Sequence, residues 1–218
     1  MPSLDFELER QQFLLYYDKN RQLFEQAKNA CISIITTLIK QSEIGEVTKV
    51  EGRIKDKDEC IKKFHRKYQS KLEADEQPYR IQDYISDLIG IRIVCLYDDQ
   101  IAQVSNVLPQ LFRIIDVTDK ISAVEGTEDS FGYKGLHMDL AIGEELAAQS
   151  KYQPFSELPF EVQIRSLIQD AWSVLDHKIK YKKSIPNDLR RRINVLSALF
   201  ELADREFKEI RNATAELM

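Results

Sequence analysis

The segment from residue 89 to residue 95 constrains the fold of this chain most strongly, because its residues alternate in character as those of a β-strand do. One face of the segment is apolar and consists of Ile89, Ile91, Ile93 and Cys95. The other face carries Arg92, and Asp87 stands at the entrance to the strand. Because a buried cation is costly unless an anion meets it, the pattern predicts either an edge-strand arginine paired with a carboxylate or a ligand site.

Three further segments, 47–55, 134–142 and 160–165, alternate in the same way, and 112–117 is another strand candidate. Together the polar faces carry Arg53, Lys55, Arg92, His137, Glu161, Gln163 and Arg165. A half-exposed sheet would give the same alternation without a site. Solvated faces usually favour Lys, Glu and Thr, however, whereas this set mixes Arg, His, Gln and Glu. The choice of residues therefore favours a site on this face.

Helical periodicity predicts helices over residues 4–42, 56–73 and 98–110, after 165, and from 184 onward. The last two carry apolar stripes, Ile168, Ala171, Trp172, Leu175 and Ile179 in one and Leu189, Ile193, Leu196, Phe200, Ala203, Phe207 and Ile210 in the other. We expect an α/β (α+β) fold, in which a mixed sheet of about five strands packs with helices. The predicted divisions are an N-terminal helical segment (1–46), a central domain (47–183) and a C-terminal helix (184–218).

Composition narrows the class of protein. The 218 residues carry a net charge of −5, which argues against non-specific nucleic-acid binding by the whole surface. No apolar run approaches the roughly 18 residues of a membrane span, and the N-terminus lacks a signal pattern, so we expect a cytoplasmic protein without a membrane partner. The three cysteines are widely spaced, which predicts reduced core thiols.

The residues on the polar faces suit phosphate chemistry. Arginine stacks on nucleobases and binds phosphates bidentately, and lysine adds a point charge. Carboxylates such as Asp87 and Glu161 can hold Mg²⁺ against phosphates, and one carboxylate can activate an attacking hydroxyl. Because the sequence contains no glycine-rich P-loop, a nucleotide site here would be of another design.

Five motifs in order match a known family. They are Gly52–Lys55, Asp87–Arg92, Gly132–His137, Phe160–Arg165 and Trp172–Lys178. In order and approximate spacing they resemble the RelA/SpoT synthetase domain over about residues 47–182. The resemblance implies that 47–183 is a nucleotidyl or pyrophosphoryl transferase domain. The total length is similar to that of a small alarmone synthetase.

The resemblance implies a GTP diphosphokinase of the stringent response. It would transfer pyrophosphate from ATP to the ribose 3′-hydroxyl of GDP or GTP, giving ppGpp or pppGpp and AMP, with Mg²⁺ as cofactor. By position, Arg53 and Arg92 would sandwich the adenine and Lys55 would meet the ATP phosphates. Asp87 and Glu161 would be the catalytic residues that hold Mg²⁺, with Glu161 as the candidate base. The acceptor nucleotide would be bound by Tyr133, Lys134, His137, Gln163, Arg165 and Asp170.

The chain departs from the family pattern on the acceptor side. The loop lysine and the asparagine before Gly132 are missing, residues 122–130 include three carboxylates, and Gly135 replaces a common serine. Two alternatives therefore stay open: a toxic relative that uses an adenosine nucleotide or the tRNA 3′ end, and a catalytically silent nucleotide-binding module. The intact Asp87 and Glu161 argue against the silent module.

The partners are less defined than the substrates. The resemblance allows a homo-oligomer through the terminal helices, and the basic cluster at 178–192 allows an RNA or tRNA contact. The sequence does not define the acceptor preference, the oligomeric state, an allosteric regulator, the physiological trigger or an antitoxin.

Overall fold

Five strands form one mixed sheet in the order β1-β2-β5-β4-β3. The computed structural model describes residues 2–42, 44–119, 135–180 and 185–217. The strands are β1 (Val47–Ile54), β2 (Ile89–Cys95), β3 (Phe112–Asp119), β4 (Leu136–Ile142) and β5 (Phe160–Ser166). Only β2 and β5 pair in parallel among these neighbours, and the other three pairs are antiparallel. The predicted mixed sheet of about five strands is therefore confirmed, and Arg92 lies on an inner strand.

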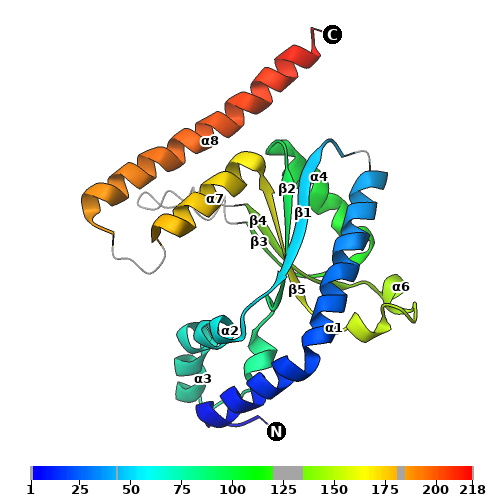
Figure 1. The fold of residues 1–218 in the computed structure, drawn as a ribbon, viewed down its shortest axis with the longest axis vertical. Coiled ribbons are helices and arrows are strands. Elements are labelled where there is room, and N and C mark those ends of the chain that lie inside the picture. Colours follow the sequence, from blue (N-terminus) through cyan, green and yellow to red (C-terminus); the bar gives the residue numbers. More distant parts are fainter. Residues whose placement is uncertain (1, 43, 120–134, 181–184, 218) are drawn as a thin grey trace.

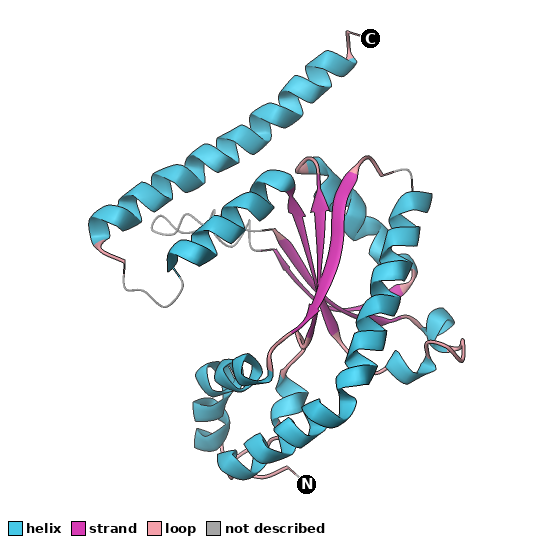
Figure 2. Cartoon of the chain, in the orientation of Figure 1, coloured by secondary structure: helices cyan, strands magenta, loops and turns pink. Residues whose placement is uncertain are grey.

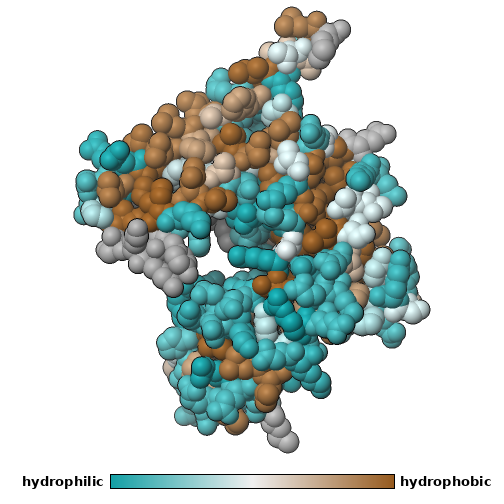
Figure 3. All heavy atoms as spheres, viewed as in Figure 1, coloured by the Kyte–Doolittle hydropathy of each residue, from teal (hydrophilic) through white to brown (hydrophobic). Residues whose placement is uncertain are grey.

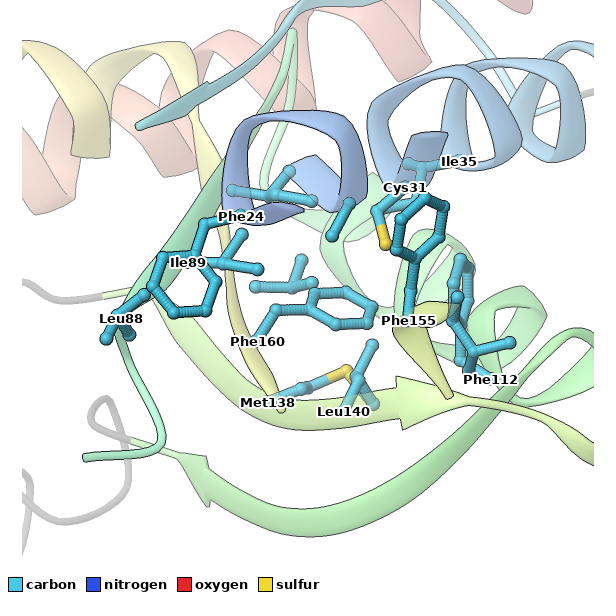
Figure 4. Packing of buried hydrophobic residues seen from close by; sticks show 14 of the residues in the cluster. Phe24, Cys31, Ile35, Leu88, Ile89, Phe112, Met138, Leu140, Phe155 and Phe160 are labelled. Carbon is cyan, nitrogen blue, oxygen red and sulfur yellow. The ribbon is translucent and has the colours of Figure 1, made fainter. Parts of the chain in front are cut away.

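A single long helix, α1 (Phe6–Gln41), covers one side of the sheet and continues through Asp18 and Asn20 without a break. Asp5 caps its first turn, because its side chain accepts a hydrogen bond from the backbone N–H of Leu8. Figures 1 and 2 show α1 running along the sheet beside β1. Its buried residues meet the apolar face of the strands, where Phe24, Cys31 and Ile35 lie near Phe160 and Leu140 (Figure 4).

The segment after β1 is one continuous helix whose middle turn is π-helical, while both ends are α-helical. It consists of α2 (Lys57–Phe64), the π-helical turn η1 (His65–Gln69) and α3 (Ser70–Ala74). Asp56 caps its start by accepting from the backbone N–H groups of Asp58 and Glu59. The predicted helix over 56–73 is thus confirmed, while the π turn carries no signal in the sequence that we recognised.

Shorter helices connect the strands. These are η2 (Ile81–Tyr84), α4 (Asp99–Val107), η3 (Leu108–Gln110), α6 (Glu144–Ala147) and η4 (Gln153–Phe155). Buried side chains from α1, α4 and the strands join in one hydrophobic cluster. All three cysteines are free and buried, as predicted, and burial raises the pKa of each thiol to about 12.

Two helices follow β5, namely α7 (Leu167–Lys180) and α8 (Asn187–Ala215). Trp172 of α7 is buried and lies 5.2 Å from Phe200 of α8 between ring centroids, which joins the two helices. The predicted apolar stripes are only partly covered, because Leu175 and Ile179 of α7 and Phe207 and Ile210 of α8 are all exposed. Within the described residues, the outer halves of both stripes are therefore left uncovered by other elements.

The C-terminal half of α8 is held by polar contacts to other elements. Arg211 binds Asp99 at the start of α4 with its nearest nitrogen 2.7 Å from Oδ2, and its guanidinium lies over the ring of Tyr97. Buried Asp204 accepts a hydrogen bond of 2.6 Å from Ser166 at the end of β5. Over the residues that the structure describes, none of the helices is long and apolar enough to cross a membrane.

Candidate active site

The polar face of the sheet borders a cavity of about 210 Å³. Its lining comes from β1 and the residue after it, from β2 and the turn before it, and from β5. The lining residues are Glu51, Gly52, Arg53, Lys55, Asp87, Gly90, Ile91, Arg92, Glu161 and Gln163. Six predicted site residues are therefore brought together, although 108 positions separate Arg53 from Glu161 in the chain. The opposite face of the same strands is the hydrophobic core.

Strand register explains why these side chains meet. Across the sheet, Arg53 pairs with Gly90, Gly90 with Glu161, and Glu161 with Asp139. A second row runs beside it through Glu51, Arg92, Gln163 and His137. Since directly paired residues of neighbouring strands share a face, both rows project to the polar side. The absence of a side chain at Gly90 leaves space between Arg53 and Glu161.

Asp87 is clamped between two lysines at the edge of the cavity. Its Oδ2 lies 2.5 Å from Nζ of Lys55, and its Oδ1 lies 2.8 Å from Nζ of Lys63. Burial acts to raise the pKa of the Asp87 carboxyl, but the hydrogen bonds from the two lysines prevail and hold it below its ordinary value. Asp87 is therefore ionised at neutral pH.

Sequence reasoning missed Lys63. It belongs to α2 and carries no feature that separates it from Lys62, whose side chain instead binds Glu59 at 3.0 Å on the exposed side of the helix. Only the fold brings Lys63 to Asp87. A second cation thereby joins Lys55 at the place where anionic groups of a ligand would enter.

Glu161 is held by two neighbours on the polar face. Nδ1 of His137 lies 2.9 Å from Oε1 of Glu161, and Nε2 of Gln163 donates to Oε2 over 2.6 Å. Asp139 of β4 lies directly opposite Glu161. Burial chiefly raises the pKa of the Asp139 carboxyl, a hydrogen bond with Ser86 partly offsets this, and the charge of Glu161 adds to the increase.

Arg92 and Arg165 share one carboxylate. Nη1 of Arg92 lies 3.1 Å from Oδ1 of Asp170 on α7, and Nη1 of Arg165 lies 3.8 Å from the same oxygen. Arg92 lines the cavity and also approaches Glu51 at 3.7 Å. Arg165 instead is buried and donates from Nη2 to Oε1 of Gln163 at 2.9 Å. Tyr133 and Lys134, the other predicted acceptor residues, lie outside the described residues.

The carboxylates suit a divalent cation that also binds phosphate. Asp87 and Glu161 line the same cavity, while no group of three metal-binding side chains occurs within the described part of the chain. Mg²⁺ typically takes one or two protein carboxylates and completes its shell with water and substrate phosphates. The donor set therefore fits a metal that arrives with a nucleotide better than a permanent structural metal.

Comparisons with known proteins agree with this geometry. A family model described as the region found in RelA / SpoT proteins matches residues 52–186. The GTP pyrophosphokinase YjbM of Bacillus subtilis is 27% identical over 210 residues, which cover 94% of this chain and 90% of YjbM. The GTP pyrophosphokinase YwaC of the same organism is 33% identical over 115 residues, and this match spans 52% of the chain and 50% of YwaC.

Solved structures show the same fold. The crystal structure of small alarmone synthetase 1 from Bacillus subtilis bound to its product pppGpp has a TM-score of 0.70 and 25% sequence identity, covering 94% of this chain and 99% of that one. Small alarmone synthetase 2 of Bacillus subtilis has a TM-score of 0.71 at 22% identity and covers 90% of this chain. The resemblance seen in the five motifs is thereby confirmed.

Proposed function

The chain belongs to the RelA/SpoT family, and from this we propose that it is a GTP pyrophosphokinase that transfers pyrophosphate from ATP to the ribose 3′-hydroxyl of GDP or GTP. The products would be ppGpp or pppGpp and AMP. The observation that carries the proposal is the single cavity in which Arg53, Lys55, Asp87, Arg92 and Glu161 all meet. Its cationic side chains can bind phosphates and stack on an adenine ring. Its carboxylates can bind a metal ion and accept a proton.

ATP would occupy the β1–β2 side of the cavity. Arg53 and Arg92 lie there on the same face of neighbouring strands, offset by two residues in register, so their guanidinium planes can take an adenine between them. Lys55 and Lys63 would bind the phosphates, because a polyphosphate can replace Asp87 as their anionic partner. The protein's contribution to such a transfer is mainly positioning and charge stabilisation.

The acceptor would approach Glu161 from the β4–β5 side. Its 3′-oxygen would attack the β-phosphorus of ATP, so that one O–P bond forms while the bond from that phosphorus to the α,β-bridging oxygen breaks. AMP departs, and the hydroxyl proton passes to Glu161. His137 and Gln163 would hold the Glu161 carboxylate for this step, with Asp170, Tyr133 and Lys134 as further acceptor residues.

Mg²⁺ is the cofactor that we propose, with Asp87 and Glu161 as its protein ligands. When bound, such an ion would neutralise charge on the phosphate oxygens of ATP. The clamp on Asp87 supports this role, since its lowered pKa keeps the carboxyl ionised and available as a ligand.

The assignment of Glu161 is tested with the variant Glu161→Gln, which keeps the size of the side chain but removes its basicity. We expect transfer from γ-labelled ATP to GDP to fall at least about 100-fold, while a fluorescent ATP analogue still binds. Glu145→Gln on α6 makes the same chemical change at an exposed site and serves as the matched control. Turnover that survives in Glu161→Gln would contradict the assignment of the base.

A homo-oligomer through the terminal helices is part of the proposal. Large apolar side chains on one side of α7 and α8 are exposed, among them Leu175, Leu196, Leu199, Leu202, Phe207 and Ile210. Figure 3 shows this apolar surface along both helices, in contrast to the polar surface around α2 and α3. The double variant Leu199→Glu/Leu202→Glu should yield monomers by light scattering, and an unchanged mass would contradict an interface there.

An adenosine nucleotide or the tRNA 3′ end as the acceptor would be detected in the same labelled-ATP assay that tests transfer to GDP and GTP. The RNA or tRNA contact that the basic cluster suggested has no support in the described residues. The division at residues 46/47 and 183/184 also stays a prediction, as does a cytoplasmic location.

A further inference from the structure

A chain of hydrogen bonds runs along β5 from Arg165 through Gln163 to Glu161, and we call it the relay. Nη2 of Arg165 donates to Oε1 of Gln163 over 2.9 Å, and Nε2 of Gln163 donates to Oε2 of Glu161 over 2.6 Å. The three residues stand two apart on one strand, so their side chains share a face and are neighbours along it. Gln163 and Glu161 line the cavity, whereas Arg165 is buried behind them with 9% of its surface exposed.

The donor at Arg165 decides how the Gln163 amide is turned. A guanidinium only donates hydrogen bonds, so the group facing it must be the carbonyl oxygen of Gln163. The NH₂ end then faces Glu161 and can donate to its carboxylate. Without Arg165, the amide could rotate by half a turn and place its oxygen against the carboxylate, where two acceptors would repel each other.

We propose that Arg165 is a positioning residue, which acts on the proposed base Glu161 through the amide of Gln163 rather than by binding the acceptor nucleotide. The inference rests on the proposed function and revises the role that the sequence suggested for Arg165. Through this relay, the Glu161 carboxylate keeps one rotamer, with Oε2 bound to Gln163 and Oε1 within reach of His137. A fixed carboxylate is what a proton transfer at a defined position requires.

Gly135 supplies the space that Arg165 occupies. A Cβ at position 135 would overlap the carbonyl oxygen of Ile164 and lie 2.5 Å from Cγ of Arg165. The stem of Arg165 therefore passes directly over Gly135, where the family pattern commonly has serine. In this chain, Gly135 therefore leaves the room that the stem of Arg165 takes up beside the hydrogen-bond chain.

The guanidinium stays charged although it is buried. Burial, followed by the charge of Arg92, lowers the pKa of Arg165 to about 10, and Asp170 opposes this decrease. At neutral pH the group is therefore a cation, and a hydrogen bond from a charged donor is stronger than one from a neutral donor. Asp170 compensates the charge at 3.8 Å without taking the nitrogen that serves Gln163.

The test is a double-variant cycle with Arg165→Met, Gln163→Leu and the combination of both, assayed for transfer from ATP to GDP. We expect Arg165→Met to lower kcat about 10- to 100-fold and to change the KM values for ATP and GDP less than about threefold. The combined variant should be no slower than Gln163→Leu alone, because Arg165 acts only through Gln163. Losses that multiply, or a raised KM for GDP with kcat retained, would overturn the inference.

Two further measurements distinguish a failure of this inference from misfolding of the variant and from a failure of the proposed function. Arg165→Lys keeps a charged donor, so its kcat should exceed that of Arg165→Met if the relay is correct, and equal values would contradict it. The side-chain amide resonances of Gln163, assigned by their loss in Gln163→Leu, should shift in Arg165→Met and move less in Arg165→Lys. This spectrum tests the contact between Arg165 and Gln163 without any need for activity. If the wild type transfers nothing to GDP or GTP, that result refutes the proposed function alone.

Discussion

The ammonium nitrogen of Lys63 lies 2.8 Å from Oδ1 of Asp87, while Lys55 holds the other oxygen of the same carboxylate. α2 and β1 thereby deliver two cations to one point at the cavity edge. In the absence of a nucleotide, the three charges neutralise one another in part. Binding of a polyphosphate with its metal would separate them, because the lysines would pair with phosphate oxygens and Asp87 would be left to hold the metal.

Replacing Lys63 by methionine should impair use of ATP. We expect kcat/KM for ATP to fall about 10- to 100-fold, because one of two phosphate-facing cations is lost. Lys62→Met is the matched control on the same helix, since Lys62 pairs with Glu59 outside the cavity. Steady-state kinetics with varied ATP measures both variants, and equal effects would show that Lys63 has no special role.

Tyr17 connects α1 to the end of β1. Its hydroxyl donates to the carbonyl oxygen of Lys55 over 2.9 Å and also accepts from Arg21. Tyr17→Phe should lower the free energy of unfolding by about 1 kcal/mol and raise the KM for ATP, because the backbone that carries Lys55 loses an anchor. Urea unfolding and kinetics measure the two effects, with Tyr97→Phe as a control near α8. A lower stability with unchanged KM would mean that the bond supports the fold alone.

Two glycines on the polar face should respond differently to alanine. Gly135→Ala forces a Cβ against Ile164 and Arg165, so we expect it to lose about 1–3 kcal/mol of stability and to lower kcat. At Gly90 the nearest atom to an added Cβ is Cγ of Arg53 at 3.9 Å, so Gly90→Ala should fold with unchanged or greater stability. Thermal unfolding compares them, and the reverse order would contradict the packing at Gly135.

Asp204 should make stability depend on pH. Burial and the nearby charge of Asp98 raise the pKa of its carboxyl to about 7, with Lys208 opposing and Asp99 adding to the rise. The folded state therefore favours the protonated form, whose contribution is complete below the unfolded pKa of about 3.9 and is lost as pH rises through about 7. The upper limit of this loss is roughly 4 kcal/mol.

Asp204→Asn should remove that dependence while keeping a partner for Ser166. We expect the variant to have a higher Tm than the wild type at pH 8 and a similar Tm near pH 4. Arg211 and Asp99 stay paired in both proteins, so this ion pair does not enter the difference. Parallel Tm curves over this range would show that Asp204 does not titrate as described.

Much of the sheet could be predicted because its alternation is strict. In β2 the isoleucines and Cys95 are all buried on one face, which also fixed Arg92 on the other. The same rule grouped Glu161, Gln163 and Arg165 correctly. It could not tell that Arg165 turns toward Gln163 instead of the cavity, because contacts between neighbours on one face depend on packing from Gly135 and α7.

Helical periodicity was informative about position and less so about burial. It located α7 and α8 and placed Trp172 on an apolar stripe, and Trp172 is buried against Phe200. It identified the apolar stripes but not their burial: Leu175 and Phe207 are exposed, because a period of 3.6 residues shows an apolar face but not what packs on it. Lys63 was missed for a related reason, because a lysine on a helix has no pattern that marks its partner.

The most direct test of the central claim is chromatography of products from purified protein with Mg²⁺ and γ-labelled ATP. GDP, GTP, ATP and deacylated tRNA are offered in parallel, with Glu161→Gln as the inactive comparison. We predict label in ppGpp and pppGpp for the wild type and none for the variant. Label confined to an adenosine product or to tRNA, or no transfer to any acceptor, would contradict the assignment of this chain as a GTP pyrophosphokinase.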